Sequence, residues 1–228
     1  MWGVVMRFRS GLVALVAFAA LSAPAFAADM PVKARPYVEP VVNWTGFYAG
    51  AFVGYHWGDI TQAGCTGLCA VNPRLDGAVA GVQFGYDYEF ANNMVLGAFG
   101  WIPVVAPRAT INLGAPGLDF HEKPRFTAVG AVRLGMAMGM GKVLPYVFVG
   151  GGFVNNEIHS DVTNVTPSAT HTAMVAGVGV EYRLARNWSV DARYMYGYVA
   201  KETYDFGGGP EQYGENSSNV LFAINYRF

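Results

Sequence analysis

The chain has 228 residues, of which 53% are hydrophobic and only 14% are charged, and its formal net charge is −1. A typical soluble domain has about 25% charged residues, so the composition favours a membrane protein. The nearly balanced charge and the lack of a basic patch exclude nucleic-acid binding, which depends on phosphate neutralisation.

The first 27 residues have the three parts of a secretory signal peptide. Two arginines precede the apolar run at residues 11–20, and the small-residue site Ala25-Phe26-Ala27 follows it. The run is shorter than the roughly 20 residues that span a bilayer, so a permanent anchor helix is disfavoured. We expect cleavage between Ala27 and Ala28, with Met6 as an alternative start. The mature chain then has 13 Lys+Arg against 16 Asp+Glu, a formal charge of −3.

The mature chain has no stretch of 18 or more apolar residues, so strands rather than helices must account for its composition. Residues 28–43 are rich in proline, which predicts a flexible periplasmic leader. Between residues 44 and 228 there are separate stretches in which apolar and polar residues alternate with a period of two, as in strands with one apolar face. The alternation predicts eight strands, at residues 44–57, 76–90, 94–104, 125–138, 143–154, 171–184, 188–198 and 219–228.

The connections between these strands alternate between long and short. Short turns are predicted at residues 91–93, 139–142 and 185–187, and long polar loops at 58–75, 106–123, 155–170 and 201–218. All long loops therefore lie at one end. This arrangement is typical of an eight-stranded antiparallel up-and-down transmembrane β-barrel with short periplasmic turns and long external loops.

Charged side chains gather on the polar faces of the predicted strands. In a soluble lipocalin-like barrel the apolar face would be core and these charges would face solvent; periodicity alone does not choose between the two. In a membrane barrel the charges fill the lumen, and four acids against five arginines favour a hydrogen-bonded network over a channel lining of one sign. The predicted lumen network consists of Asp87, Glu89, Arg125, Arg133, Glu181, Arg183, Asp191, Arg193 and Arg227.

The last predicted strand alternates cleanly and ends on an aromatic residue. An exposed strand of this kind would be an aggregation hazard in a soluble protein, whereas pairing with the first strand would close a barrel. The residues expected to face lipid are Val220, Phe222, Ile224, Tyr226 and Phe228.

Two cysteines, Cys65 and Cys69, lie in a glycine-rich segment. In an oxidising compartment they are best interpreted as a small loop-closing disulfide. A metal site normally needs four ligands, and a redox pair more usually has C-x-x-C spacing, so both alternatives are weaker.

The candidates for chemistry are few. A lipid-modifying barrel enzyme would need a nucleophile, a histidine and an acid, and only Ser168, His171 and Glu181 come into question. The other histidines, His56, His121 and His159, could bind haem or metal but fit solvated strand ends and loops better. We expect no enzyme activity, no cofactor and no metal.

Several stretches together resemble the porin-like surface-antigen outer-membrane barrels of alphaproteobacteria, within the broader OmpA-like group. The resemblance rests on Asn43-Trp-Thr-Gly-Phe-Tyr-Ala-Gly50, Thr127-Ala-Val-Gly-Ala-Val-Arg-Leu-Gly135, Ala176-Gly-Val-Gly-Val-Glu-Tyr182 and Asn225-Tyr-Arg-Phe228. It implies an outer-membrane structural and surface role, contact with lipid and lipopolysaccharide, and an unknown ligand at the loops. It also implies that Tyr226 and Phe228 are recognised by the outer-membrane assembly machinery.

The chain departs from this family pattern at two places. Phe99 and Trp101 stand where the family tends to have acids, and Arg193 stands where it tends to have Glu. The leading functional hypothesis is a structural barrel that contributes to envelope integrity and surface contacts. The alternative is a passive channel for small solutes, although side chains just fill the interior of an eight-stranded barrel.

Overall fold

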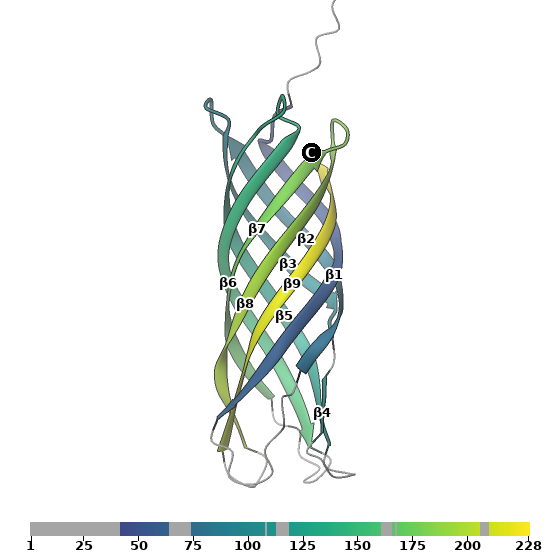
Figure 1. Cartoon of the computed structure of the whole chain (residues 1–228), viewed down its shortest axis with the longest axis vertical. Coiled ribbons are helices and arrows are strands. Elements are labelled where there is room, and N and C mark those ends of the chain that lie inside the picture. The colour runs from purple at the N-terminus through teal and green to yellow at the C-terminus, as the bar shows by residue number, and fades with distance from the viewer. Residues whose placement is uncertain are drawn as a thin grey trace, which may run out of the picture. The chain divides into compact units, whose positions relative to one another are not determined.

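A computed structural model shows the chain as a barrel of antiparallel strands (Figure 1). The structure describes residues 42–63, 74–107, 109–112, 119–160, 166, 168–205 and 210–228, with backbone only for the described residues in 109–126 and for 158, 160, 205, 210 and 211. The predicted signal segment, most of the leader, and both cysteines lie outside the described residues. The strands are β1 (Gly46–Ala63), β2 (Arg74–Glu89), β3 (Met94–Val105), β4 (Ala109–Asn112), β5 (Asp119–Met136), β6 (Val143–Ser160), β7 (Ser168–Arg183), β8 (Trp188–Asp205) and β9 (Pro210–Arg227).

The barrel is closed by the pairing of the first strand with the last. β1 pairs with β9 from Tyr48↔Arg227 to Ala63↔Gln212, and the Phe228 amide donates to the Phe47 carbonyl at 3.1 Å. β3 and the short β4 both pair with β5, so the wall has eight strands. The predicted eight-stranded antiparallel barrel is confirmed. Among the described residues, no helix has the length and hydropathy needed to span a membrane.

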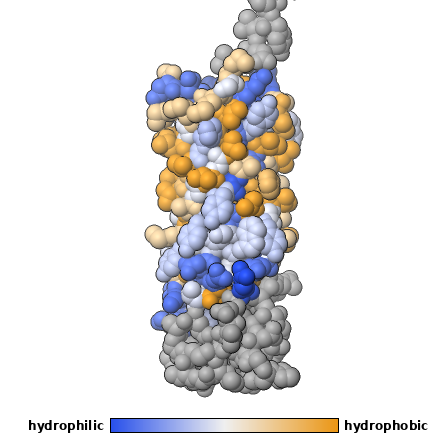
Figure 2. Space-filling model, viewed as in Figure 1, coloured by the Kyte–Doolittle hydropathy of each residue, from blue (hydrophilic) through white to orange (hydrophobic). Residues whose placement is uncertain are grey.

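Alternate residues face opposite sides of the wall, as the strand pleat requires. On β9, Phe222 is 56% exposed and Ile224 46%, whereas Leu221 between Val220 and Phe222 is 2% exposed. Figure 2 shows the outward apolar residues gathered towards the end with the short turns, followed by a paler and then a hydrophilic zone towards the other end. The outer surface therefore has an apolar band suited to lipid, and the band is shorter than the strands.

The strands are longer than the alternation predicts. β5, β6, β8 and β9 each have 18 residues, or about 60 Å of extended chain, whereas 9–11 tilted residues cross a bilayer. The predicted loop bounds 58–75, 106–123, 155–170 and 201–218 are therefore wrong in part; at the first of them, β1 continues to Ala63 and β2 begins at Arg74. Beyond the lipid both faces of a strand are wet, so backbone pairing continues without the apolar pattern that would reveal it.

The short turns lie where they are predicted, after β2, β5 and β7. Asn93 has a φ of 62°, and the turn after β5 contains three consecutive residues with positive φ, Gly139, Met140 and Gly141. Asparagine and glycine adopt this left-handed conformation at low cost, which allows the chain to reverse within a few residues.

The wall is irregular where β3 leaves β5. The β3–β5 ladder ends at Trp101↔Val129, and the β4–β5 ladder begins at Ala109↔Glu122. Pro103 and Pro107 lie in the intervening stretch, where proline cannot donate a ladder hydrogen bond.

Candidate functional site

A cluster of four charged side chains crosses the lumen near the short turns. Arg133 donates from Nε to Asp87 at 2.8 Å and from Nη1 to Glu181 at 2.9 Å. Arg227 lies 2.7 Å from Asp87 and 3.1 Å from Glu181 through its two Nη atoms. Two acids and two arginines make the cluster formally neutral, and none of the four side chains is more than 5% exposed. A buried ion pair is stable only when further hydrogen bonds support it, and Ser189 and Asn225 supply them to Glu181, whereas the buried Nε of Arg227 has no hydrogen-bond partner among the described residues.

Neutral polar groups complete the cluster. The Ser189 hydroxyl donates to Glu181 Oε1 at 2.5 Å, and the Asn225 amide donates to the same oxygen at 3.1 Å. The Gln83 amide in turn donates to Asn225 Oδ1 at 2.7 Å. This chain of bonds links the first charged layer to the next.

Arg193 and Asp191 form the second layer. Arg193 donates to Gln83 Oε1, and the Tyr146 hydroxyl donates to Asp191 at 2.5 Å. The Arg193 guanidinium also stacks on Phe99 and Trp101, at 5.4 and 5.6 Å from their ring centroids. Planar guanidinium groups stack well on aromatic rings, so cation–π contacts hold Arg193 in this layer.

Trp44 fills the mouth of the barrel at the end with the short turns. Its ring is fully buried, and its indole nitrogen donates to the Gly141 carbonyl at 2.8 Å. The guanidinium groups of Arg183 and Arg227 lie 4.5 and 4.7 Å from its ring centroid. Its backbone amide donates to Glu89 Oε2 at 2.7 Å. The mouth is thus closed by a side chain that precedes β1.

Glycines make room for these bulky lumen groups. A Cβ at Gly97 would overlap Asp87, and one at Gly177 would lie 2.5 Å from Cζ of Phe148. The wall of a small barrel curves tightly, so an inward charge or ring fits only where the neighbouring strand has no side chain.

The structure places the nine predicted lumen residues in different settings. Asp87, Arg133, Glu181 and Arg227 meet in one cluster, and Asp191 and Arg193 lie in the next layer. Arg183 and Glu89 contact Trp44 instead. The backbone of Arg125 lies at a register shift between Pro124 and Phe126, and its side chain lies outside the described part.

Sequence reasoning missed Trp44 as a lumen residue and assigned it to the first strand, which begins only at Gly46. It also missed the hydrogen-bonding roles of Gln83, Ser189 and Asn225. The alternation did carry a signal, because Gln83, Asn225 and Ser189 fall on the inward faces of their strands.

The structure does not bring the predicted catalytic candidates together. His121 lies on β5, where its backbone pairs with His159, and its side chain is outside the described part. The two ring nitrogens of His171 lie 2.7 Å from the Tyr204 hydroxyl and 2.8 Å from the Ala200 carbonyl. Glu181 is ten residues along the same strand, or about 33 Å away, so Ser168, His171 and Glu181 are not brought together. His159 contacts Thr166, at 2.8 Å. Among the described residues, no group of His, Cys, Asp and Glu could hold a metal ion.

Comparison with known proteins agrees with the architecture. The 31 kDa outer-membrane immunogenic protein of Brucella melitensis biotype 1 is 28% identical over 238 residues, with coverage of 95% of this chain and 99% of that protein. Outer membrane protein OprG from Pseudomonas aeruginosa has a TM-score of 0.56 at 11% identity, with coverage of 83% of this chain and 99% of that one. Neisserial surface protein A has a TM-score of 0.50 at 16% identity, with coverage of 81% and 98%.

The match to a family model decides the assignment. The model described as outer membrane protein beta-barrel domain matches residues 13–228, which is nearly the whole chain. The two solved structures support the fold alone, whereas the family match and the Brucella relative also support the location. The protein therefore resides in the outer membrane and belongs to the outer membrane protein beta-barrel domain family.

Proposed function

We propose that the protein is a structural, non-conducting barrel that contributes to envelope integrity and surface contacts. The observation that carries this proposal is the neutral cluster of Asp87, Arg133, Glu181 and Arg227 across the lumen. Trp44 closes the mouth beneath it. Opening a water-filled path would require these bonded charges to separate, and breaking a buried pair costs about 3–5 kcal/mol.

The charge balance argues against the alternative, a passive channel for small solutes. A conducting pore concentrates ions with a lining of one sign or a wide aqueous lumen, and an eight-stranded barrel is just wide enough for side chains to fill. Here positive and negative groups neutralise each other at hydrogen-bond distance. The cluster therefore supports a plug rather than a selectivity filter.

Surface contact is the second part of the proposal. The strands extend well past the apolar band on the long-loop side, so they carry a polar surface beyond the membrane (Figure 2). The Brucella relative is named an immunogenic protein, which fits a chain exposed at the cell surface. We include lipid, lipopolysaccharide and an unknown loop ligand among its partners, and recognition of Tyr226 and Phe228 by the assembly machinery.

The proposal also holds that the barrel is not an enzyme. Incubation of the purified protein with labelled lipopolysaccharide should leave the lipid unchanged. A deacylated or otherwise modified product would contradict this part.

Planar-bilayer conductance tests the central claim. The purified full-length barrel should give no steady current under conditions in which a wide porin, inserted in the same bilayer, conducts. A steady open state of nanosiemens size that scales with the number of inserted barrels would overturn the non-conducting assignment.

The envelope role needs a separate measurement in cells. A strain that lacks the protein should be more sensitive to detergent, and the wild-type chain should restore resistance. Unchanged sensitivity of the deletion strain would contradict the role in envelope integrity while leaving the conductance result intact.

A further inference from the structure

The lumen is not filled along its whole length. Beyond the Arg193 layer, towards the long-loop end, lies a cavity of about 130 Å³. Phe52 and Trp101, on which Arg193 stacks, also line this cavity, together with Met195 and Leu221. The second charged layer and these apolar groups therefore separate the cavity from the sealed end of the barrel.

The cavity exists because the inward residues at this level are small. Val79, Val129, Ala173, Val175 and Gly197 line it from four strands, β2, β5, β7 and β8. At the level below, the inward positions carry aromatic rings and arginines that meet across the lumen. Small side chains on facing strands of the same barrel cannot meet, so they leave an apolar space.

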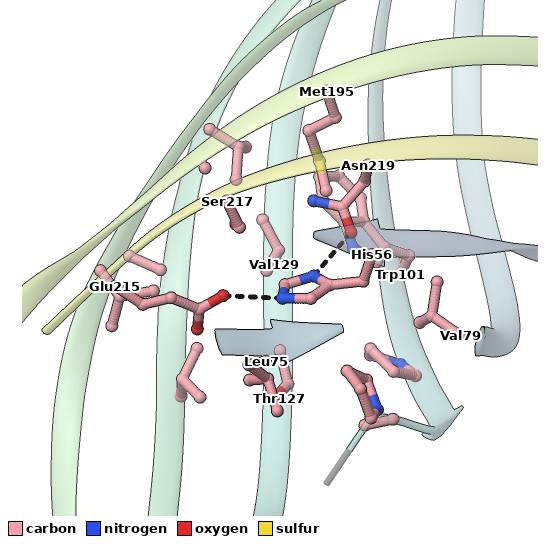
Figure 3. A pocket seen from close by; sticks show the side chains of 18 of the residues that line it. His56, Leu75, Val79, Trp101, Thr127, Val129, Met195, Glu215, Ser217 and Asn219 are labelled. Carbon is pink, nitrogen blue, oxygen red and sulfur yellow. Dashed lines mark hydrogen bonds and ion pairs between the residues drawn. The ribbon is translucent and has the colours of Figure 1, made fainter. Parts of the chain in front are cut away.

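One side of the cavity is polar. His56 on β1 lies between two residues of β9, with Nε2 2.7 Å from Glu215 Oε1 and Nδ1 2.9 Å from Asn219 Oδ1. Figure 3 shows His56 bonded to Glu215 and Asn219, with Val79, Val129 and Met195 among the lining residues around it. Ser217, between the two β9 residues, also lines the cavity. The site thus combines apolar walls with a few convergent polar groups, which is the usual make-up of a small-molecule site.

We propose that this cavity binds a small uncharged molecule, aromatic or branched aliphatic, that carries one hydroxyl group. An apolar cavity of about 150 Å³ binds benzene, and a cavity of about 130 Å³ is of the same order, which limits the ligand to one small ring or a short branched chain. The hydroxyl would face His56 and Glu215, because a carboxylate has about four acceptor positions and can take an additional donor. The ligand is uncharged because, apart from His56 and Glu215, no charged side chain of the described residues lines the cavity. Beyond the polar side, apolar side chains and the neutral Thr127 and Asn156 line the rest, where an ionic group would lose its solvation without a charged partner.

The probe is 4-fluorophenol, followed by fluorine NMR with the full chain in lipid nanodiscs. Two matched pairs of variants separate the cavity from the lipid. Val129→Phe and Val175→Phe fill the cavity from β5 and β7, whereas Val132→Phe and Val178→Phe add the same group to the exposed outer face of the same strands. The inward variants should raise the Kd about tenfold or more, because the added ring takes the space that the ligand occupies. The outward variants should leave the Kd unchanged.

Two further measurements use the unmodified protein, so they do not depend on whether a variant folds. Magnetisation should transfer between the probe and the Met195 methyl group, and fluorobenzene should bind more weakly than 4-fluorophenol because it lacks the hydroxyl. Absence of the Met195 contact, or equal effects of inward and outward variants, would show partition into lipid only and would overturn the site. Equal affinity for the two probes would overturn the role of His56 and Glu215.

Discussion

Arg193 stacks against the indole ring of Trp101, with 5.6 Å between the guanidinium carbon and the ring centroid. Both residues depart from the pattern of the family that the sequence resembles, in which acids tend to occupy these places. The two departures therefore meet in space. Arg193 also contacts Gln83 and Asp191. It stands at the position where the resembled family is expected to have an acid.

Arg193→Glu tests whether this layer depends on the cation. The variant would place a second acid beside Asp191 with no cation in that layer, so the free energy of unfolding should fall by about 3–5 kcal/mol. Arg193→Lys keeps the charge but loses the planar stacking, and should cost about 1–2 kcal/mol. Urea titration of the barrel in lipid vesicles measures both. Equal losses for Glu and Lys would contradict the assignment.

Glu181→Ala should destabilise the barrel much more than removal of a surface acid. It leaves Arg133 and Arg227 buried with Asp87 as their only acidic partner, so the expected loss is about 3–5 kcal/mol. Asp59→Ala is the control, since Asp59 is 74% exposed and lies 3.5 Å from an exposed Arg74. Its loss should stay below about 1 kcal/mol. The same urea titration measures both variants, and a similar loss for the two would mean that the lumen cluster contributes no special stability.

Gly177→Ala and Gly130→Ala form a matched pair. A Cβ at Gly177 would overlap the Tyr194 carbonyl oxygen of the neighbouring strand and lie 2.5 Å from Cζ of Phe148, so the substitution overpacks this part of the wall and should cost about 1–3 kcal/mol. A Cβ at Gly130 meets nothing within 4 Å, so that variant should be neutral or more stable by about 0.4–1 kcal/mol. Denaturant midpoints decide the order, and a reversed order would contradict the role of Gly177 in making room for Phe148.

Deletion of Phe228 should lower the amount of heat-modifiable barrel in the outer membrane of cells. The side chain is 78% exposed and contacts Tyr226, with 5.3 Å between ring centroids. The deletion also removes the backbone hydrogen bond from Phe228 to Phe47, which is one at the very end of the long β1–β9 ladder, so the intrinsic stability should change little. Refolding of the purified variant into vesicles should therefore proceed as for the wild type. Phe222→Ala removes an exposed ring from the same strand without altering the chain end, and should assemble normally. Normal assembly of the deletion variant would contradict recognition through Phe228.

The sequence was a reliable guide inside the lipid band and a poor one outside it. On β9 the alternation assigned Phe222 and Ile224 to the outer face, as the structure has them. The same reasoning ended the strand that begins at Val143 near residue 154, whereas β6 continues to Ser160 in the structure. Alternation arises only where one face meets lipid and the other meets the lumen, so it cannot mark strand segments that are wet on both faces.

The sequence alone therefore determined the class of barrel, its up-and-down order and the inward charges, because the pleat forces alternate residues to opposite faces. Only the tertiary structure decided which charges meet. Arg133, Asp87, Glu181 and Arg227 come from four different strands, and strand register, set by contacts far apart in the chain, determines whether they face one another. Only the tertiary structure shows that Trp44 is buried against Arg183 and Arg227. Only the tertiary structure shows the cavity as well, because its volume depends on small residues that separate strands place at one level.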